Sequence, residues 1–270
     1  MNNTLPISNA FKIEGLRIGL TGGGGNLGSA IALQALALGA KVLICGRSEE
    51  SLQKVKITAS GMNLPGTLIT RQADISSDDQ VAGLLDLMIE KWQGIDGWIN
   101  NASAATMSNL LSLDRKAVEE TVYSELVNVM MATDAVAKRM IGANQPGSIV
   151  NIASMYGLVS PQPDTYCDYP QYHNPPAYGA AKAGIIQFTR YAACHYGSHQ
   201  IRVNAVSPGP FPKEEIRKEK GFVEELEKRV PLQRIGRPEE VALPVLFLLS
   251  SAAGYINGHN LVVDGGWTAW

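Results

Sequence analysis

The segment Thr21-Gly22-Gly23-Gly24-Gly25-Asn26-Leu27-Gly28 follows a short apolar run at 16–20 and precedes a stretch with helical apolar spacing at 29–38. A strand that breaks into glycines and then enters a helix directs backbone N–H groups and the positive end of the helix at a pyrophosphate. A ligand-free glycine loop is the alternative, and the strand and helix on either side weigh against it. The segment therefore predicts the first strand–turn–helix unit of a nucleotide-binding sheet.

Strand-like and helix-like segments alternate along the rest of the chain. Apolar strands are expected at 42–45, 68–73, 95–101, 148–153, 201–206 and 260–263, and helices around 81–92, over 115–141, from 178 to about 196, and after 238. Repeated β-α units whose strands are apolar throughout predict a parallel sheet covered by helices on both faces. The expected fold class is α/β, a doubly wound, Rossmann-like parallel sheet.

No change of composition marks a second domain within the 270 residues. We expect one domain over 13–270, preceded by a flexible lead-in over 1–12. Within the domain, a proline-rich segment at 160–176 is expected to form a substrate loop, and a charged segment at 210–230 is expected to form a lid.

Composition narrows the classes of partner. The net charge of −2 gives no electrostatic reason to expect nucleic acid or an anionic membrane. The apolar segments are too short to span a bilayer, and the first residues lack the order of a secretory signal peptide. Three widely spaced cysteines predict no disulfide framework, and no spacing of His, Cys and carboxylates predicts a metal site. We expect a cytoplasmic enzyme with a small-molecule substrate.

Tyr178 and Lys182 lie four residues apart in a segment with helical spacing, so they share one helix face. A phenol is a weak acid at neutral pH, and an adjacent cation favours its ionised form. The pair therefore predicts general acid–base chemistry. A surface helix pair has the same spacing, so the interpretation depends on the glycine-rich turn found elsewhere in the chain.

Two further motifs accompany the turn and the pair: R-V-N-A-V-S-P-G at 202–209 and V-V-D-G-G at 262–266. Together they resemble the short-chain dehydrogenase/reductase family over about 13–266. The glycine frame T-G-x-x-G-x-x-G is similar to the larger nucleotide-sugar branch of that family, because the single-domain branch has a glycine where this chain has Asn26. The chain length and the two later motifs resemble the single-domain branch, which we therefore expect.

The resemblance implies a cofactor site built from several strand ends. Asn101 and Ala102 fall in the family's N-N-A-G motif, with Ser103 in place of the glycine, and Asp74-Ile75 matches the pair beside the adenine. The full set implied at the cofactor is Gly22, Gly25, Asn26, Leu27, Gly28, Arg47, Asp74, Ile75, Asn101, Ala102, Tyr178, Lys182, Pro208, Gly209 and Phe211. In relatives the C-terminal edge packs between subunits, so a homotetramer is also implied.

The implied reaction moves a hydride between a nicotinamide and a substrate carbon. Tyr178 would give or take the hydroxyl proton, and Ser154 would hold the oxygen on which charge develops. Lys182 would favour the phenolate and bind the nicotinamide ribose. Many relatives complete a proton relay with an asparagine, and Glu125 takes its place in this chain. Glu125 either orders a water in that relay or is a paired structural charge.

The end of the second strand bears on the choice of cofactor. NAD needs a carboxylate there for the ribose 2′-hydroxyl, whereas an arginine accommodates the 2′-phosphate of NADP. This chain has Gly46 followed by Arg47. We expect NADP(H) as the preferred cofactor and NAD(H) as the alternative, in which Arg47 is a solvated loop charge.

Ser154 and Tyr178 are further apart in sequence than in most members of the family. The extra length is the loop 160–176, whose prolines favour a defined shape. Its tyrosines and other hydrogen-bonding groups suit a polyhydroxylated ligand, and Tyr166, Tyr172 and His173 are candidate substrate contacts. A surface or subunit-contact loop is the alternative.

Three functions compete on this basis. The expected one is an oxidoreductase that transfers a hydride between NADP(H) and the carbonyl or secondary alcohol of a sugar, polyol or sugar acid. The second keeps the chemistry but acts on a 3-oxoacyl thioester. The third is a non-catalytic NADP(H)-binding sensor, against which the retained Ser154, Tyr178 and Lys182 weigh.

Overall fold

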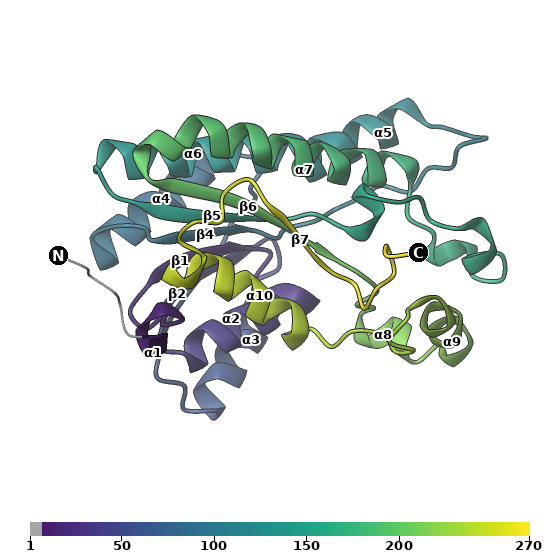
Figure 1. Cartoon of the computed structure of the whole chain (residues 1–270), viewed down its shortest axis with the longest axis horizontal. Helices are drawn as coiled ribbons and strands as arrows, with labels where there is room; N and C mark the ends of the chain where they lie inside the picture. Colours follow the sequence, from purple (N-terminus) through teal and green to yellow (C-terminus); the bar gives the residue numbers. More distant parts are fainter. Residues whose placement is uncertain (1–6) are drawn as a thin grey trace.

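A computed structural model describes residues 7–270, which form a parallel sheet between two layers of helices (Figure 1). The strands are β1 (Arg17–Thr21), β2 (Lys41–Gly46), β3 (Thr67–Gln72), β4 (Gly97–Asn100), β5 (Gly147–Ile152), β6 (Ile201–Pro208) and β7 (Asn260–Val263). Their order is β3-β2-β1-β4-β5-β6-β7, and every pair is parallel. The predicted doubly wound, Rossmann-like sheet is confirmed.

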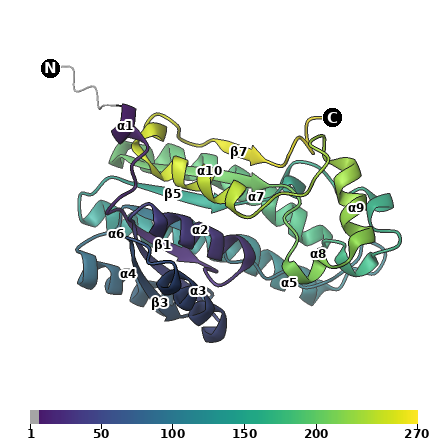
Figure 2. The ribbon, with the colours of Figure 1, turned by 90° about the horizontal axis from the view of Figure 1, so that it is seen from below.

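The helices divide between the two faces of the sheet. They are α1 (Ile7–Ala10), α2 (Asn26–Ala37), α3 (Glu49–Gly61), α4 (Asp78–Trp92), α5 (Arg115–Val122), α6 (Asn128–Gly142), α7 (Pro176–Tyr196), α8 (Glu214–Arg217), α9 (Lys220–Arg229) and α10 (Glu239–Leu249). Helices α2, α3 and α10 cover one face, and α4, α6 and α7 cover the other (Figures 1 and 2). No helix within residues 7–270 is long and apolar enough to cross a membrane.

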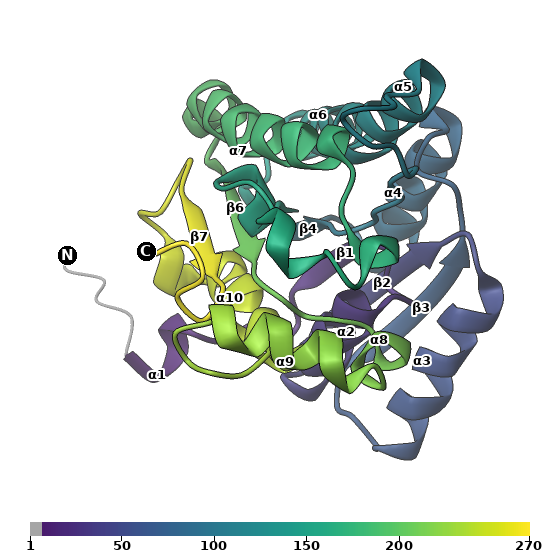
Figure 3. The ribbon, with the colours of Figure 1, turned by 90° about the vertical axis from the view of Figure 1, so that its right-hand side faces the viewer.

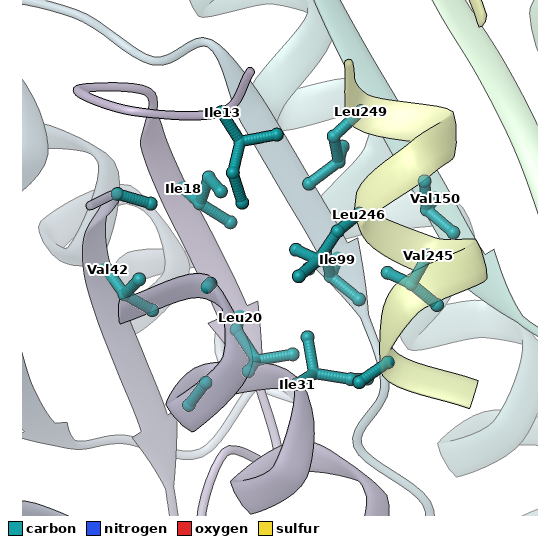
Figure 4. Close-up of a cluster of buried hydrophobic side chains, with 14 of the residues drawn as sticks. Ile13, Ile18, Leu20, Ile31, Val42, Ile99, Val150, Val245, Leu246 and Leu249 are labelled. Carbon is teal, nitrogen blue, oxygen red and sulfur yellow. The ribbon is translucent and has the colours of Figure 1, made fainter. Parts of the chain in front are cut away.

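The strands are apolar on both faces because both faces are covered. On one face, Ile18 of β1 packs with Ile31 of α2 and Leu246 of α10, and all three are buried (Figure 4). On the other face, Trp98 of β4 and Met88 of α4 are fully buried in a second cluster. The sheet therefore lies between two hydrophobic cores, one on each face.

One helix differs from the sequence-based expectation. The helix expected over 115–141 is interrupted by a π-turn at Tyr123–Val127, which adds a residue to one turn and buries Glu125 completely. Within the expected lead-in, α1 is helical, and the Phe11 ring stacks on Phe247 with centroids 6.1 Å apart. Residues 1–6 of that prediction lie outside the described residues.

The carboxyl ends of the strands all point to one end of the sheet. Figure 3 looks at this end, where α8 and α9 lie in front of the sheet, near the connection between β5 and α7. Strand β1 lies between β2 and β4. The strands that follow β1 in the chain are added first on the side of β2 and β3, and then on the side of β4, so the direction of the strand order switches at β1. Ligands of doubly wound sheets bind in the crevice at this switch of direction.

Candidate active site

A cavity of about 770 Å³ occupies this end of the sheet. It extends from the glycine-rich turn after β1 to the first turns of α7. Of the residues predicted from the sequence, its lining contains Gly22, Gly25, Asn26, Leu27, Gly28, Arg47, Asp74, Ile75, Asn101, Ala102, Ser154, Tyr178, Lys182, Pro208, Gly209 and Phe211. The structure thus brings the whole predicted cofactor set and three of the four predicted catalytic residues around one space.

The other four predicted site residues lie outside the cavity lining. Glu125 is buried behind Lys182. Tyr166 is 5 % exposed, and its hydroxyl pairs with that of Tyr156. Tyr172 and His173 belong to the same aromatic group, with the His173 ring edge-on to Tyr166 at 5.2 Å between centroids. The structure therefore does not bring the three loop residues to the cavity surface.

The aromatic side chains of the loop instead surround Phe222 of α9. The ring centroids of Tyr166, Tyr169 and Tyr172 lie 5.8, 5.3 and 4.7 Å from that of Phe222. Arg229, at the end of α9, donates a hydrogen bond to Gln162 of the loop. These contacts fasten the predicted lid to the predicted substrate loop.

The glycine-rich turn fits a diphosphate. Gly22 has a φ of +65°, and a Cβ on Gly28 would overlap the carbonyl oxygen of Gly22. Helix α2 begins at Asn26 after Gly25, and no side chain caps its first N–H groups. Unfilled donors and the positive helix end face the cavity, which is the arrangement that binds phosphate oxygens.

The end of β4 holds this turn in place. The Asn101 amide donates to the carbonyls of Thr21 at 3.0 Å and Gly22 at 3.1 Å. The Thr21 hydroxyl accepts hydrogen bonds from the backbone N–H groups of Asn101 at 2.9 Å and Ala102 at 3.0 Å. The role of Thr21 was not predicted, although the residue directly precedes the turn.

The ends of β2 and β3 form the far wall of the cavity. Arg47 is exposed there, and no carboxylate ends β2. The Asp74 carboxylate accepts a hydrogen bond from the Ser76 N–H at 3.0 Å. This bond is the main reason why the pKa of Asp74 is below its ordinary value.

Ser154 and Tyr178 come together because two backbones approach closely. Ser154 begins a 3₁₀ turn at Met155–Gly157, and its Oγ accepts a hydrogen bond from the Tyr156 N–H at 3.1 Å. A Cβ on Gly157 would lie 2.8 Å from backbone atoms of α7, and a Cβ on Gly179 would lie 2.9 Å from the Tyr156 carbonyl oxygen. Glycine at both positions allows this approach, which places Ser154 and Tyr178 on the same part of the cavity wall.

Lys182 is almost entirely buried beneath this wall. Its Nζ donates to the Ile152 carbonyl at 3.0 Å, lies 2.9 Å from Oε2 of Glu125, and lies 5.4 Å from the centroid of the Tyr178 ring. Burial alone would lower the pKa of Lys182, but the Glu125 carboxylate and Tyr178 together outweigh burial and hold this pKa above its ordinary value.

Several residues around the cavity were not predicted. Ser103, Ala104, Tyr123, Ser124, Asn128 and Lys213 also line it. The Ser103 hydroxyl donates to Oε1 of Glu125 at 2.6 Å. The serine at position 103, where the N-N-A-G motif has a glycine, was the feature of the sequence that could have indicated a role for Ser103. No feature of the sequence indicated the π-turn that brings Tyr123 and Ser124 to the cavity.

Comparisons with known proteins agree with this architecture. The family model described as enoyl-(acyl carrier protein) reductase matches residues 25–268. L-Rhamnose-1-dehydrogenase of Scheffersomyces stipitis is 31% identical over 259 residues, with 94% of this chain and 96% of that protein covered. The 3-oxoacyl-(acyl-carrier-protein) reductase of Thermotoga maritima is 32% identical over 260 residues, with 95% and 99% covered.

A solved structure agrees as well. The crystal structure of a short-chain type dehydrogenase/reductase from Mycobacterium marinum has a TM-score of 0.88 and 30% identity, with 98% of this chain and 100% of that chain covered. The family model and the relatives thus span nearly the whole chain at a level that shows common descent and fold. The chain belongs to the short-chain dehydrogenase/reductase family, oxidoreductases that act on alcohol and carbonyl groups with an NAD(P) cofactor.

Proposed function

We propose that this enzyme transfers a hydride between NADP(H) and a carbonyl or secondary alcohol of a sugar, polyol or sugar acid. One observation carries the proposal. Ser154, Tyr178 and Lys182 share one wall of a cavity whose other end is an uncapped helix N-terminus behind a glycine-rich turn. A dinucleotide held by its phosphates at that turn would extend toward the three side chains.

The bound nicotinamide supplies the hydride donor or acceptor. In alcohol oxidation, Tyr178 takes the proton of the substrate hydroxyl, and in carbonyl reduction it returns that proton. Ser154 Oγ accepts from the Tyr156 N–H, so its own O–H is free to donate to the substrate oxygen on which charge develops. Lys182 holds a positive charge beside the Tyr178 ring.

The cofactor preference rests on the end of β2. Arg47 lines the cavity there, and a guanidinium suits a 2′-phosphate. Asp74, the acidic residue of this wall, already accepts a hydrogen bond from the Ser76 N–H. We infer that NADP(H) is preferred over NAD(H).

The substrate class rests on the polarity of the remaining wall. Asn128 and Lys213 line the cavity together with Ser154, so hydrogen-bonding groups lie near the reacting position. A long acyl chain would offer these three groups no partner. The relative named L-rhamnose-1-dehydrogenase agrees with a sugar substrate. The loop 160–176 contributes by holding the lid at 210–230 over the cavity, because its aromatic residues hold Phe222.

A panel of sugars, polyols and sugar acids, in both reaction directions and with both cofactors, tests the proposal through nicotinamide absorbance. We expect turnover with at least one of these compounds and a higher kcat/KM with the NADP(H) pair. An equal or higher kcat/KM with the NAD(H) pair would overturn the cofactor assignment. Tyr178→Phe should remove turnover while leaving NADPH affinity nearly unchanged, and undiminished activity would overturn the mechanism.

An acyl thioester reductase is the second candidate, favoured by the relative from Thermotoga maritima and by the description of the family model. An acetoacetyl thioester included in the same panel separates the two. A kcat/KM for the thioester above that for every sugar compound would favour this candidate instead. Cofactor binding without turnover of any compound would point to a sensor.

Arg47→Ala isolates the cofactor assignment. Loss of charged hydrogen bonds to a phosphate should lower kcat/KM for NADPH by about tenfold or more and leave NADH nearly unaffected. Arg190→Ala, an exposed arginine on α7, is the matched control and should change neither value.

A further inference from the structure

Two positions at which the chain departs from the family pattern contact each other. By the family resemblance, Ser103 stands where the N-N-A-G motif has its glycine, and Glu125 stands where many relatives have an asparagine. The Ser103 hydroxyl and the Ala104 N–H each donate to Oε1 of Glu125 at 2.6 Å. Oε2 faces Nζ of Lys182 at 2.9 Å. The Glu125 carboxyl group therefore accepts two hydrogen bonds through Oε1 and forms an ion pair with the Lys182 ammonium through Oε2.

The ion pair is buried on both sides. The side chains of Lys182 and Glu125 are 4 % and 0 % exposed. An ammonium removed from water loses its hydration, and only an opposite charge or good acceptors replace it. The other neighbours of Lys182 are the Ile152 carbonyl and the face of the Tyr178 ring, both of which are uncharged when the phenol is protonated.

No second carboxylate pairs with Lys182 within residues 7–270. Tyr178 shares α7 with Lys182, and the adjoining 3₁₀ turn contributes Tyr156, whose hydroxyl pairs with that of Tyr166. The other ionisable groups of the cavity lining are Arg47, Asp74, Tyr123 and Lys213. Burial opposes the charge of Lys182, whereas Glu125 and, after it, Tyr178 favour that charge, and the lysine pKa is raised as a result. Glu125 is the carboxylate in contact with the ammonium.

We propose that Glu125, oriented by Ser103 and the Ala104 N–H, is the counter-ion that keeps Lys182 charged and positioned beside Tyr178 throughout the working pH range. Glu125 is thus a positioning residue that acts through Lys182, and this role rests on the proposed function of Tyr178. A neutral amide at position 125 leaves the ammonium buried without an opposite charge. The ammonium then loses its proton at a lower pH, and the support of the Tyr178 phenolate is lost with it.

Glu125→Gln tests the proposal in the oxidation direction, where a deprotonated Tyr178 is needed and high pH does not otherwise oppose turnover. We expect wild-type kcat to hold between about pH 7 and pH 9, whereas kcat of Glu125→Gln falls about tenfold or more over the same range, because burial lowers a lysine pKa by several units. Glu125→Asp keeps the charge and should retain the wild-type pH profile at a reduced kcat.

A second measurement follows Lys182 without any turnover. In protein labelled with ¹³C at the lysine Cε, the Lys182 signal is the one missing from Lys182→Met. Its titration midpoint should lie at least about one pH unit lower in Glu125→Gln than in the wild type. Identical lysine titrations in the two proteins would overturn the proposal.

The two measurements separate this proposal from the proposed function. If Tyr178→Phe were active, the proton-transfer role of Tyr178 would be refuted. The lysine titration would still test whether Glu125 keeps Lys182 charged, because it needs no turnover. If Glu125→Gln does not fold, Glu125→Asp and Ser103→Ala carry the test. Ser103→Ala removes one of two donors to Oε1 and should lower kcat about two- to tenfold without shifting the alkaline limit. A wild-type kcat in Ser103→Ala would refute the orienting role of Ser103.

Discussion

The side-chain amide of Asn26 donates a hydrogen bond to the carbonyl of Phe211 at 3.1 Å. Asn26 is the first residue of α2 at the glycine-rich turn, and Phe211 lies shortly after the end of β6 at Pro208, within the predicted lid. This bond joins two segments that are far apart in the chain. The glycine-rich turn and the predicted lid are therefore joined directly by a hydrogen bond.

Asn26→Ala should weaken both features together. Loss of one neutral hydrogen bond costs about 0.5–1.5 kcal/mol, so the Kd for NADPH should rise about two- to tenfold. Cleavage of the lid by a protease should become faster, because the segment that begins at Phe211 loses an anchor. Fluorescence titration with NADPH and limited proteolysis measure the two effects. Asn109→Ala, an exposed asparagine outside the cavity lining, should change neither, and an unaltered Kd in Asn26→Ala would refute the anchoring role.

Gly28 and Gly83 offer a matched pair of glycine substitutions. A Cβ on Gly28 would overlap the Gly22 carbonyl oxygen and lie 2.8 Å from the Asn101 amide nitrogen, whereas a Cβ on Gly83 in α4 meets nothing within 4 Å. Gly28→Ala should therefore displace the turn and lower NADPH affinity about tenfold or more, together with the unfolding temperature. Gly83→Ala should raise stability by about 0.5–1 kcal/mol, because alanine is the better helix former. Equal affinities in the two variants would contradict the close approach at Gly28.

The fold and most of the residues that line the cavity were predictable because both depend on local patterns. A few adjacent residues are enough to indicate an apolar strand or the glycine-rich turn. Because the carboxyl ends of parallel strands meet at one edge of the sheet, residues that follow these strands are expected to lie close together. Asp74 and Asn101 were assigned to the site by the family resemblance, and both lie just beyond strand ends. Ser154 was assigned by the same resemblance and by its place just after the end of β5.

The contacts between distant segments were not predictable. Tyr166 and Tyr172 were expected to face the substrate because their loop re-enters the sheet beside Tyr178. They pack on Phe222 instead, since α9 brings a large apolar side chain to the same place. The pairing of Ser103 with Glu125 was equally hidden, because it depends on a π-turn that no residue pattern marks.

Phe222→Ala should release the lid from the loop 160–176. Phe222 is 4 % exposed, and removing a buried phenylalanine costs about 3–5 kcal/mol of local packing. Hydrogen exchange should become faster in 213–229 and 160–176 together, and KM for the substrate should rise more than KM for NADPH. Tyr255→Ala, which removes a fully exposed aromatic ring, is the control and should leave exchange in both segments unchanged. Faster exchange in the lid without any change in the loop would show that the two segments are not coupled through Phe222.

Asp96 should contribute stability that depends on pH and does not involve the cavity. It precedes β4 at the amino ends of the strands, and its carboxylate accepts hydrogen bonds from Arg17 Nε at 2.7 Å, Arg17 Nη2 at 2.6 Å and Gln145 Nε2 at 3.0 Å. Burial alone would raise the pKa of Asp96, but these bonds outweigh burial and hold it below the ordinary value. Because the pKa is lower in the folded state, the stabilisation is complete above the unfolded-state pKa and is lost as the pH falls through the folded-state pKa.

Asp96→Asn should therefore lower the free energy of unfolding by about 1–3 kcal/mol near pH 7, and the difference from wild type should shrink below about pH 4. Urea unfolding followed by circular dichroism at several pH values measures it. Asp86→Asn is the control, because Asp86 pairs with Arg139 at 2.8 Å on the surface, where side chains that are 59 % and 41 % exposed are screened by water. If the loss of stability in Asp96→Asn stays constant down to pH 3, the loss would come from altered packing of the asparagine side chain and not from the missing carboxylate charge.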